Sequence, residues 1–231
     1  MEAIVLAGGL GTRLAPKLDG LPKAMAQVAG RPFLEILLSQ LNRPGCTRVL
    51  LSVGHLHHVI QNHFGTSFHG MRLDYVIENV PLGTGGAIRK ALAEAAEKSV
   101  LVLNGDTYLD ADYAAMMRFH EAQGAGMTMA VTHQADIARY GGVLVNEGRV
   151  IAYEEKGRSG PGWINAGVYV LRKEIQWPPA LPQRFSFEMD FLAKEISRLA
   201  PAAYRVDGFF LDIGVPEDLD RAQRELTGLE K

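Results

Sequence analysis

The fold of this chain is decided by one segment near its N-terminus, Ala3-Ile4-Val5-Leu6-Ala7-Gly8-Gly9-Leu10-Gly11-Thr12-Arg13-Leu14. It opens with five apolar residues closed by two glycines, which is typical of a strand buried on both faces of a parallel sheet. Glycines after such a strand let the backbone approach a ligand and turn its N–H groups toward an anion, and Arg13 adds a guanidinium suited to phosphate. The segment is not a dinucleotide fingerprint, because Leu14 stands where the last glycine is needed, and the chain has no Gly-Lys-Ser/Thr of a Walker A loop. We therefore expect a phosphate-binding loop of another kind; a plain Gly-rich turn is the alternative.

The remaining sequence alternates between strand-like and helix-like segments. In the first half, short apolar runs predict strands over Ala3–Ala7, Arg48–Val53, Arg72–Ile77 and Val100–Leu103. Between and after them, apolar residues at helical spacing predict helices over Phe33–Leu41, His55–Phe64, Ala87–Lys98 and Tyr113–Gln123. Such units predict a mainly parallel sheet covered by helices. The second half predicts a mixed extension of that sheet, with strands over Met127–Thr132, Val143–Val145, Val150–Tyr153, Ile164–Leu171 and Phe209–Ile213, and with helices over Glu188–Leu199 and from Pro216. We expect a three-layer α/β/α fold and a single domain over residues 1–231.

The composition excludes several classes of function. The 231 residues include 24 Lys and Arg against 26 Asp and Glu, so the net charge of −2 gives no basic field for nucleic acid or an anionic membrane. No apolar stretch approaches the ~18 residues that span a bilayer, and we expect no targeting segment. Cys46 is the only cysteine, which excludes an intramolecular disulfide and fits a reducing compartment. We expect a cytoplasmic protein whose partners are small molecules, and a homo-oligomer stays open.

The dipeptide Pro22-Lys23 lies ten residues beyond the arginine of the glycine loop. Taken alone, Lys23 would be a solvated surface lysine. Together, G-G-x-G-T-R and the downstream P-K resemble the signature of the sugar-1-phosphate nucleotidyltransferases. The resemblance implies a Rossmann-like nucleotidyltransferase fold, Mg²⁺ as cofactor, and a reaction that joins an NTP to a sugar 1-phosphate and releases pyrophosphate. It also implies that one contiguous stretch and the lysine bind the nucleotide: Leu6, Ala7, Gly8, Gly9, Gly11, Thr12, Arg13 and Lys23.

Further segments resemble motifs of the same family, in the same order along the chain. Pro81–Ala87 resembles the segment that contacts the base and opens a helix, through Gly83, Thr84, Gly85 and Gly86, although these residues could also cap the helix. The resemblance assigns a metal-binding aspartate to each of two strand ends, Asp106 in Asn104-Gly105-Asp106 and Asp212 in Phe210–Gly214, and Asp106 also to the nucleotide. It assigns the sugar phosphate to six residues: Asn104, Gly142 in Tyr140-Gly141-Gly142, Glu155 and Lys156 in Glu154-Glu155-Lys156, Asn165 in Asn165-Ala166-Gly167-Val168-Tyr169, and Asp212.

These residue types suit a reaction between two anions. A sugar-phosphate oxygen must attack the α-phosphorus of an NTP, and Mg²⁺ between Asp106 and Asp212 would offset the repulsion. Arg13 and Lys23 would stabilise charge on the departing pyrophosphate. The resemblance thus makes these four residues the catalytic set, and no protein nucleophile is needed.

Two other classes of function remain open. A glycosyltransferase of similar fold would use the D-x-D of Asp110 and Asp112, which we interpret as helix-capping residues. A non-catalytic nucleotide sensor would have lost a metal or phosphate ligand, and here all are present. The four histidines between positions 55 and 63 lack the i, i+4 pairing of a zinc site, which favours a solvated helix face.

Within the family, several segments look most like those of guanylyltransferases that act on a heptose 1-phosphate, namely PLGTGGAIRKAL, RYGGVLV, FSFE and FFLDIGVPEDLDRAQ. The expected substrates are therefore GTP and D-glycero-α-D-manno-heptose 1-phosphate. Short family members that act on mannose, glucose or N-acetylmuramate 1-phosphates share most of these motifs and stay open as alternatives.

Overall fold

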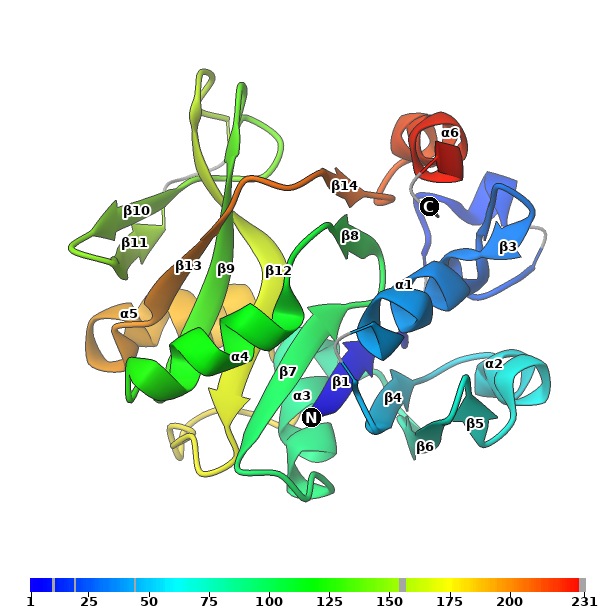
Figure 1. Cartoon of the computed structure of the whole chain (residues 1–231), viewed down its shortest axis with the longest axis horizontal. Coiled ribbons are helices and arrows are strands. Elements are labelled where there is room, and N and C mark those ends of the chain that lie inside the picture. Colours follow the sequence, from blue (N-terminus) through cyan, green and yellow to red (C-terminus); the bar gives the residue numbers. More distant parts are fainter. Residues whose placement is uncertain (10, 19, 44, 154–156, 229–231) are drawn as a thin grey trace.

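The computed structural model describes residues 1–9, 11–18, 20–43, 45–153 and 157–228. Ten strands form one mixed sheet: β1 (Glu2–Leu6), β4 (Arg48–Val53), β5 (Ser67–Phe68), β6 (Met71–Ile77), β7 (Ser99–Asn104), β9 (Met127–Gln134), β10 (Val143–Asn146), β11 (Arg149–Tyr153), β12 (Gly162–Arg172) and β13 (Ala202–Val206). Their order is β10-β11-β13-β9-β12-β7-β1-β4-β6-β5. The pairings make seven of these ten strands run in one direction, with β5, β11 and β12 opposed (Figure 1).

Two short ribbons and the helices complete the chain. The ribbons are β2 (Gln27–Val28) with β3 (Arg31–Pro32), and β8 (Thr107–Leu109) with β14 (Phe210–Asp212). The α-helices are α1 (Phe33–Asn42), α2 (His57–Phe64), α3 (Gly83–Ala93), α4 (Tyr113–Ala122), α5 (Ala193–Leu199) and α6 (Pro216–Glu225). Short helical turns are η1 (Ala15–Lys17), η2 (Lys23–Met25), the π-helical η3 (Phe187–Leu192) and η4 (Leu226–Gly228).

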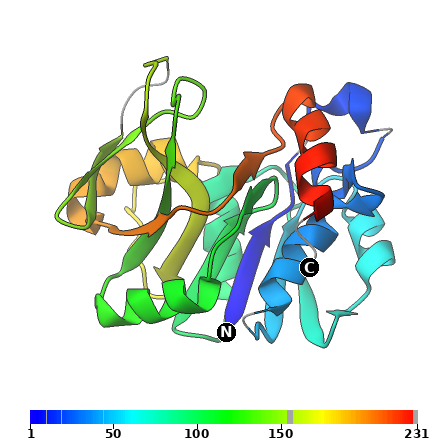
Figure 2. The ribbon, with the colours of Figure 1, turned by 45° about the horizontal axis from the view of Figure 1, so that its top comes forward.

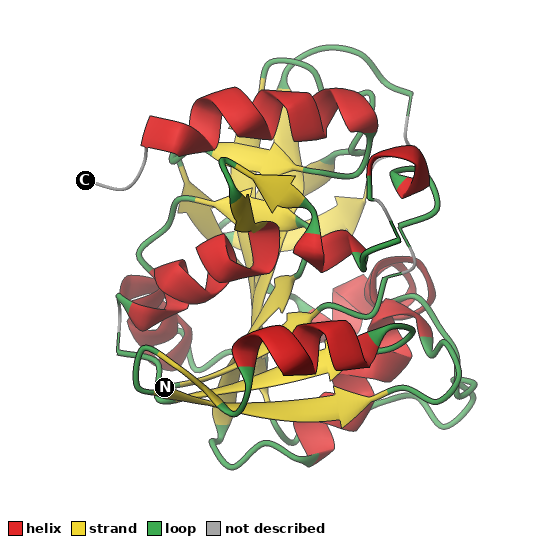
Figure 3. Ribbon diagram, turned by 90° about the vertical axis from the view of Figure 1, so that its right-hand side faces the viewer, coloured by secondary structure: helices red, strands yellow, loops and turns green. Residues whose placement is uncertain are grey.

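The sheet is buried on both faces, which confirms the predicted three-layer fold. Successive residues of β1 point to opposite faces. Ala3 and Val5 belong to one apolar cluster with Leu37 of α1, and Ile4 belongs to a second cluster with Ile88 of α3. In Figure 1, α1 and α4 lie in front of the sheet and α3 and α5 behind it, and Figure 3 shows helices on both sides of the strands. A continuous apolar run is therefore what this strand needs.

Four neighbouring parallel strands, β7, β1, β4 and β6, end at the same edge of the sheet. The glycine loop follows β1, and Asn104-Gly105-Asp106 ends β7. A side chain at Gly105 would place its Cβ 2.4 Å from the carbonyl oxygen of Leu6, so only glycine lets the two strands lie this close after they end. Such carboxyl ends are where α/β sheets bind ligands.

The predicted elements differ from the structure in several places, including the following. The strand at Phe209–Ile213 does not enter the main sheet, because β14 pairs with β8. The strand β13 was not predicted. The helix expected from Ala87 begins at Gly83, and the helix expected over Glu188–Leu199 begins with a π-helical segment and ends at Leu199.

Candidate functional site

Lys23 and Asp106 form the centre of the candidate site. Lys23 starts η2 and is 9% exposed, and its Nζ lies 2.5 Å from Oδ2 of Asp106. Gly11 in the glycine loop has φ +61°, and a Cβ there would lie 2.9 Å from Cβ of Lys23. The loop can pack against the lysine stem only because residue 11 is glycine. The structure thus brings the glycine loop and Lys23 together. Because Lys23 is buried, it is not a solvated surface lysine.

The β8–β14 ribbon brings Asp212 to Asp106. Asp212 pairs with Thr107 in the ribbon, and the backbone N–H of Ile213 donates to the carbonyl oxygen of Asp106 at 2.9 Å. Burial and the neighbouring Asp106 carboxylate raise the pKa of Asp212 to about 6, while Lys23 and the N–H of Gly214 oppose the rise. Residues separated by more than one hundred positions thus form one acidic pair.

The acidic pair suits a divalent cation that is completed by substrate. Oδ1 of Asp212 is buried and has no hydrogen-bond partner among the described residues, and a buried carboxylate oxygen without a partner is costly. Within the described ranges, no group of three or more His, Cys, Asp and Glu side chains could hold a metal. Mg²⁺ typically takes one or two carboxylates and fills its remaining positions with water and phosphate oxygens. Asp106 and Asp212 fit that pattern.

The glycine loop lies at the mouth of the site. Leu6 ends β1, the N–H of Ala7 donates to the carbonyl oxygen of Ser52 at 2.8 Å, and Gly9 and Thr12 are exposed. Arg13 is also exposed and makes no ion pair with the part of the chain that the structure describes. Lys17, in the helical turn η1 that follows the loop, forms an ion pair with α6: its Nζ lies 2.5 Å from Oδ1 of Asp220. Figure 2 shows α6 beside this N-terminal segment.

The predicted base segment opens α3, and its glycines serve close packing. The N–H of Gly85 donates to the carbonyl oxygen of Phe185 at 3.0 Å, and a Cβ on Gly85 would lie 2.2 Å from the Phe185 ring. Cβ atoms on Gly83 and Gly86 would likewise collide with backbone oxygens of residues 185 and 183. Thr84 is not an N-cap, because its hydroxyl donates to Oε2 of Glu188 at 2.8 Å and accepts from the N–H of residue 187.

Asn165 belongs to a hydrogen-bond network on the sugar side. Its amide nitrogen donates to the hydroxyls of Tyr169 at 2.7 Å and Tyr153 at 3.3 Å, and its oxygen accepts from the N–H of Gly167 at 3.0 Å. The hydroxyl of Tyr169 donates to Oε1 of Glu188 at 3.4 Å, and burial raises the pKa of both tyrosines. Both amide hydrogens of Asn165 are therefore engaged within the protein.

The other residues predicted for the sugar phosphate divide into two groups. Asn104 ends β7 with its Oδ1 buried and without a partner among the described residues, and its side chain packs against Gly167, whose φ is +69°. Gly142 is buried and bridges to Ile164 of β12. Glu155 and Lys156 lie outside the described residues.

Two features were missed or left open by the sequence. Arg139, beside Tyr140-Gly141-Gly142, forms a two-point ion pair with the buried Asp218 of α6, which ties this loop to the helix that follows Asp212. Asp112 caps α4, since its Oδ1 accepts from the N–H of Ala115 at 2.8 Å, so the capping interpretation is confirmed for Asp112 of the D-x-D.

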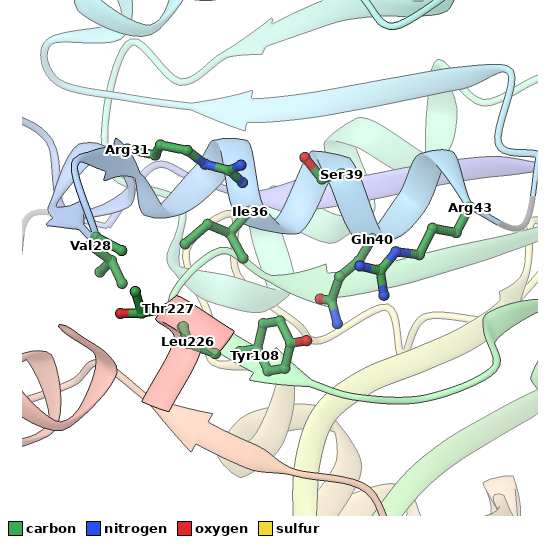
Figure 4. A pocket seen from close by; sticks show the side chains of 10 residues that line it. Val28, Arg31, Ile36, Ser39, Gln40, Arg43, Tyr108, Leu226 and Thr227 are labelled. Carbon is green, nitrogen blue, oxygen red and sulfur yellow. The ribbon is translucent and has the colours of Figure 1, made fainter. Parts of the chain in front are cut away.

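The structure contains a cavity of 580 Å³ beside the glycine loop, lined by Gly8, residues 54–58, residues 77–79 and Pro81. A second cavity of 130 Å³ lies between α1, β8 and η4 (Figure 4). The described residues that line this second cavity include none of those predicted for the site.

The comparisons with known proteins show the family of this chain. The nucleotidyl transferase family model matches residues 2–228, so the chain belongs to that family. It is 43% identical over 226 residues to the D-glycero-alpha-D-manno-heptose 1-phosphate guanylyltransferase of Aneurinibacillus thermoaerophilus, covering 98% of each chain. It is 41% identical over 219 residues to the enzyme of that name from Campylobacter jejuni, covering 94% of this chain and 96% of the relative.

Solved structures give the same fold. The crystal structure of HddC from Yersinia pseudotuberculosis superposes with a TM-score of 0.85 at 35% identity, covering 97% of this chain and 99% of that one. HddC has also been solved in complex with GMP-PN, and that structure superposes with a TM-score of 0.84 at 34% identity over the same shares of the two chains. Within the described ranges, none of the helices has the length and apolar character needed to cross a membrane.

Proposed function

We propose that this protein transfers GMP from GTP to D-glycero-α-D-manno-heptose 1-phosphate, giving GDP-heptose and pyrophosphate. The observation that carries the proposal is the Lys23–Asp106 contact beside Asp212, at the sheet edge where the glycine loop lies. A cation next to a carboxylate pair is what a reaction between two polyphosphorylated anions requires. The two relatives with more than 40% identity over nearly the whole chain carry this activity in their names, which supports the choice of substrates.

The chain's residues bind and orient the two substrates. The glycine loop directs backbone N–H groups at the triphosphate, and Arg13 and Lys23 stabilise the negative charge that collects on the departing pyrophosphate. Asp106 and Asp212 would hold Mg²⁺, which supplies positive charge between the two phosphates when bound. The sugar-phosphate oxygen is itself the nucleophile, so the protein supplies none of its own and holds both partners in place for in-line attack on the α-phosphorus.

The sugar side is assigned by the same proposal. Lys156 binds the phosphate of the sugar, and Glu155 orients hydroxyls together with Asn104 and the backbone of Gly142. Asn165 contributes by fixing the hydroxyls of the neighbouring tyrosines, because its own amide hydrogens are already donated. The free and buried Cys46 suits a protein of the cytoplasm.

The proposal is tested by pyrophosphate release with Mg²⁺ for four NTPs crossed with heptose, mannose, glucose and N-acetylmuramate 1-phosphates. Release with GTP and the manno-heptose phosphate supports it. Turnover with another pair keeps the mechanism and rejects the heptose assignment. Binding of an NTP without any release rejects catalysis in favour of a nucleotide sensor.

A further inference from the structure

The chain between Asp212 and the helix α6 is short and tightly held. The strand β14 ends at Asp212, and α6 begins at Pro216. In between, the N–H of Ile213 donates to the carbonyl oxygen of Asp106 at 2.9 Å, and a Cβ on Gly214 would lie 2.9 Å from Oδ1 of Asp212. Because so few residues separate them, a shift of the first turn of α6 moves the Asp212 carboxylate with it.

An ion pair with the loop after β9 fixes the first turn of α6. Asp218, the third residue of α6, is 4% exposed, whereas the side chain of Arg139 in the loop is 54% exposed. The guanidinium binds the carboxylate at two points, with Nη1 donating to Oδ1 at 3.2 Å and Nη2 donating to Oδ2. A planar guanidinium bound in this way fixes orientation as well as distance. Since a buried carboxylate without a partner is costly, Arg139 is what allows Asp218 to be buried.

A second contact joins the same loop to the strand that carries Asp212. The guanidinium carbon of Arg139 lies 5.6 Å from the centre of the Tyr140 ring, and that ring meets the Phe210 ring edge to face, with centroids 5.5 Å apart. Phe210 lies in β14, two residues before Asp212. The loop, which also contains Gly142, therefore holds the chain both before and after the metal-site aspartate.

We propose that Arg139 is a positioning residue that fixes the carboxylate of Asp212 relative to the loop of Gly142. It acts through Asp218 and Tyr140, which hold the chain after and before Asp212. The inference rests on the proposed function, which places Mg²⁺ at Asp212 and the sugar phosphate at Gly142. Loss of a group that supports a metal-binding side chain typically costs about 10- to 100-fold in metal affinity or activity.

Charge alone predicts the opposite effect on metal affinity. In Arg139→Met the Asp218 carboxylate loses its counter-charge, and an added negative charge near Asp212 would attract a cation more strongly. Positioning predicts weaker metal binding, because Asp212 is no longer held in place. The double variant Arg139→Met/Asp218→Asn removes both charges, so it leaves no buried carboxylate unpaired and isolates the positioning effect.

The first test measures the affinity for GTP by isothermal titration calorimetry, with Mn²⁺ and again with EDTA, in the absence of a sugar phosphate. The ratio of the two Kd values gives the contribution of the metal. We expect this ratio to fall about 10- to 100-fold, toward one, in Arg139→Met and in the double variant. The Kd in EDTA should stay unchanged, because the glycine loop and Lys23 are untouched.

The matched control is Arg198→Met. Arg198 lies in α5, its side chain is 47% exposed, and its Nε is 2.6 Å from Oε2 of Glu195. The control should keep the wild-type ratio. A wild-type ratio in the double variant would overturn the inference, and a ratio of one in the wild type would reject a metal at Asp212 and the inference with it. Absence of GTP binding by the wild type would reject the proposed function.

The second test separates positioning from stability. Arg139→Met should lower both the Tm and kcat/KM for the heptose 1-phosphate, the latter about 10- to 100-fold at a temperature where the variant is folded. The double variant should regain Tm but not kcat/KM. If it regains both, Arg139 only stabilises the fold, and the inference is wrong. If the wild type turns over no sugar phosphate, the proposed function fails, while the GTP affinities still decide whether Arg139 positions Asp212.

Discussion

Replacing Asp212 by asparagine should stabilise the protein while it abolishes turnover. The pKa of Asp212 is raised from 3.8 to about 6, mainly because the carboxylate is buried next to Asp106. Two pKa units at 1.36 kcal/mol each correspond to about 3 kcal/mol that the folded state loses by keeping this group ionised. The folded state binds the proton more tightly than the unfolded state, so its stability falls as the pH rises from about 4 to 6 and stays lower above.

Asp212→Asn removes that cost, and at 2–4 °C per kcal/mol for a chain of this size we expect its Tm at pH 7.5 to rise by about 6–12 °C. The gain should vanish near pH 4, where the wild-type carboxyl is protonated. The assay is thermal unfolding at both pH values, with the exposed Asp207→Asn as control. Saturating Mg²⁺ should raise the Tm of the wild type more than that of Asp212→Asn, and turnover of the variant should fall at least about 100-fold. A variant less stable than wild type at pH 7.5, or a difference that does not change with pH, would refute the reasoning.

Three further outcomes are expected. Lys23→Met should lower kcat/KM for pyrophosphate release about 10²- to 10³-fold, the cost of losing one preorganised charge-stabilising group, whereas exposed Lys98→Met should leave it unchanged; equal rates would remove Lys23 from the site. Gly167→Ala should cost about 1–3 kcal/mol in urea unfolding, because φ is +69° and the new Cβ would lie 2.7 Å from Nδ2 of Asn104; unchanged stability would contradict this strain. His120 is fully buried and burial lowers its pKa, so unfolding free energy should fall as the pH drops below about 6.5, and His120→Gln should weaken this dependence.

The parallel half of the fold could be predicted from local patterns, and the pieces that failed depend on tertiary contacts. The strands at Ala3–Ala7 and Arg48–Val53 can be predicted from their own residues, because a strand buried on both faces has a continuous apolar sequence. Helical spacing alone starts this helix at Ala87, whereas α3 begins at Gly83; glycine disfavours helix, and the fit against Phe185 accounts for the earlier start. The strand β13, Ala202–Val206, has no alternating pattern of its own and forms by pairing with β9.

The candidate site was predictable where residues lie directly after strands of the parallel sheet. Asp106 follows β7, and its carboxylate lies 2.5 Å from Nζ of Lys23, a residue that the resemblance assigns to the same nucleotide site. Asp212 lies near it only because β14 leaves the main sheet to pair with β8, a pairing that no local pattern reveals. Glu188 and Arg139 were missed as partners for the same reason, since their contacts, Thr84 and Asp218, lie 104 and 79 positions away in the sequence.

The most direct test of the central claim is to measure pyrophosphate and nucleotide sugar together, from GTP and D-glycero-α-D-manno-heptose 1-phosphate in the presence of Mg²⁺. The account predicts that the two products appear in equal amounts at equal rates, and that neither forms when EDTA removes the metal or when Asp106→Asn replaces the wild type. Pyrophosphate without GDP-heptose, or full turnover of Asp106→Asn, would contradict it.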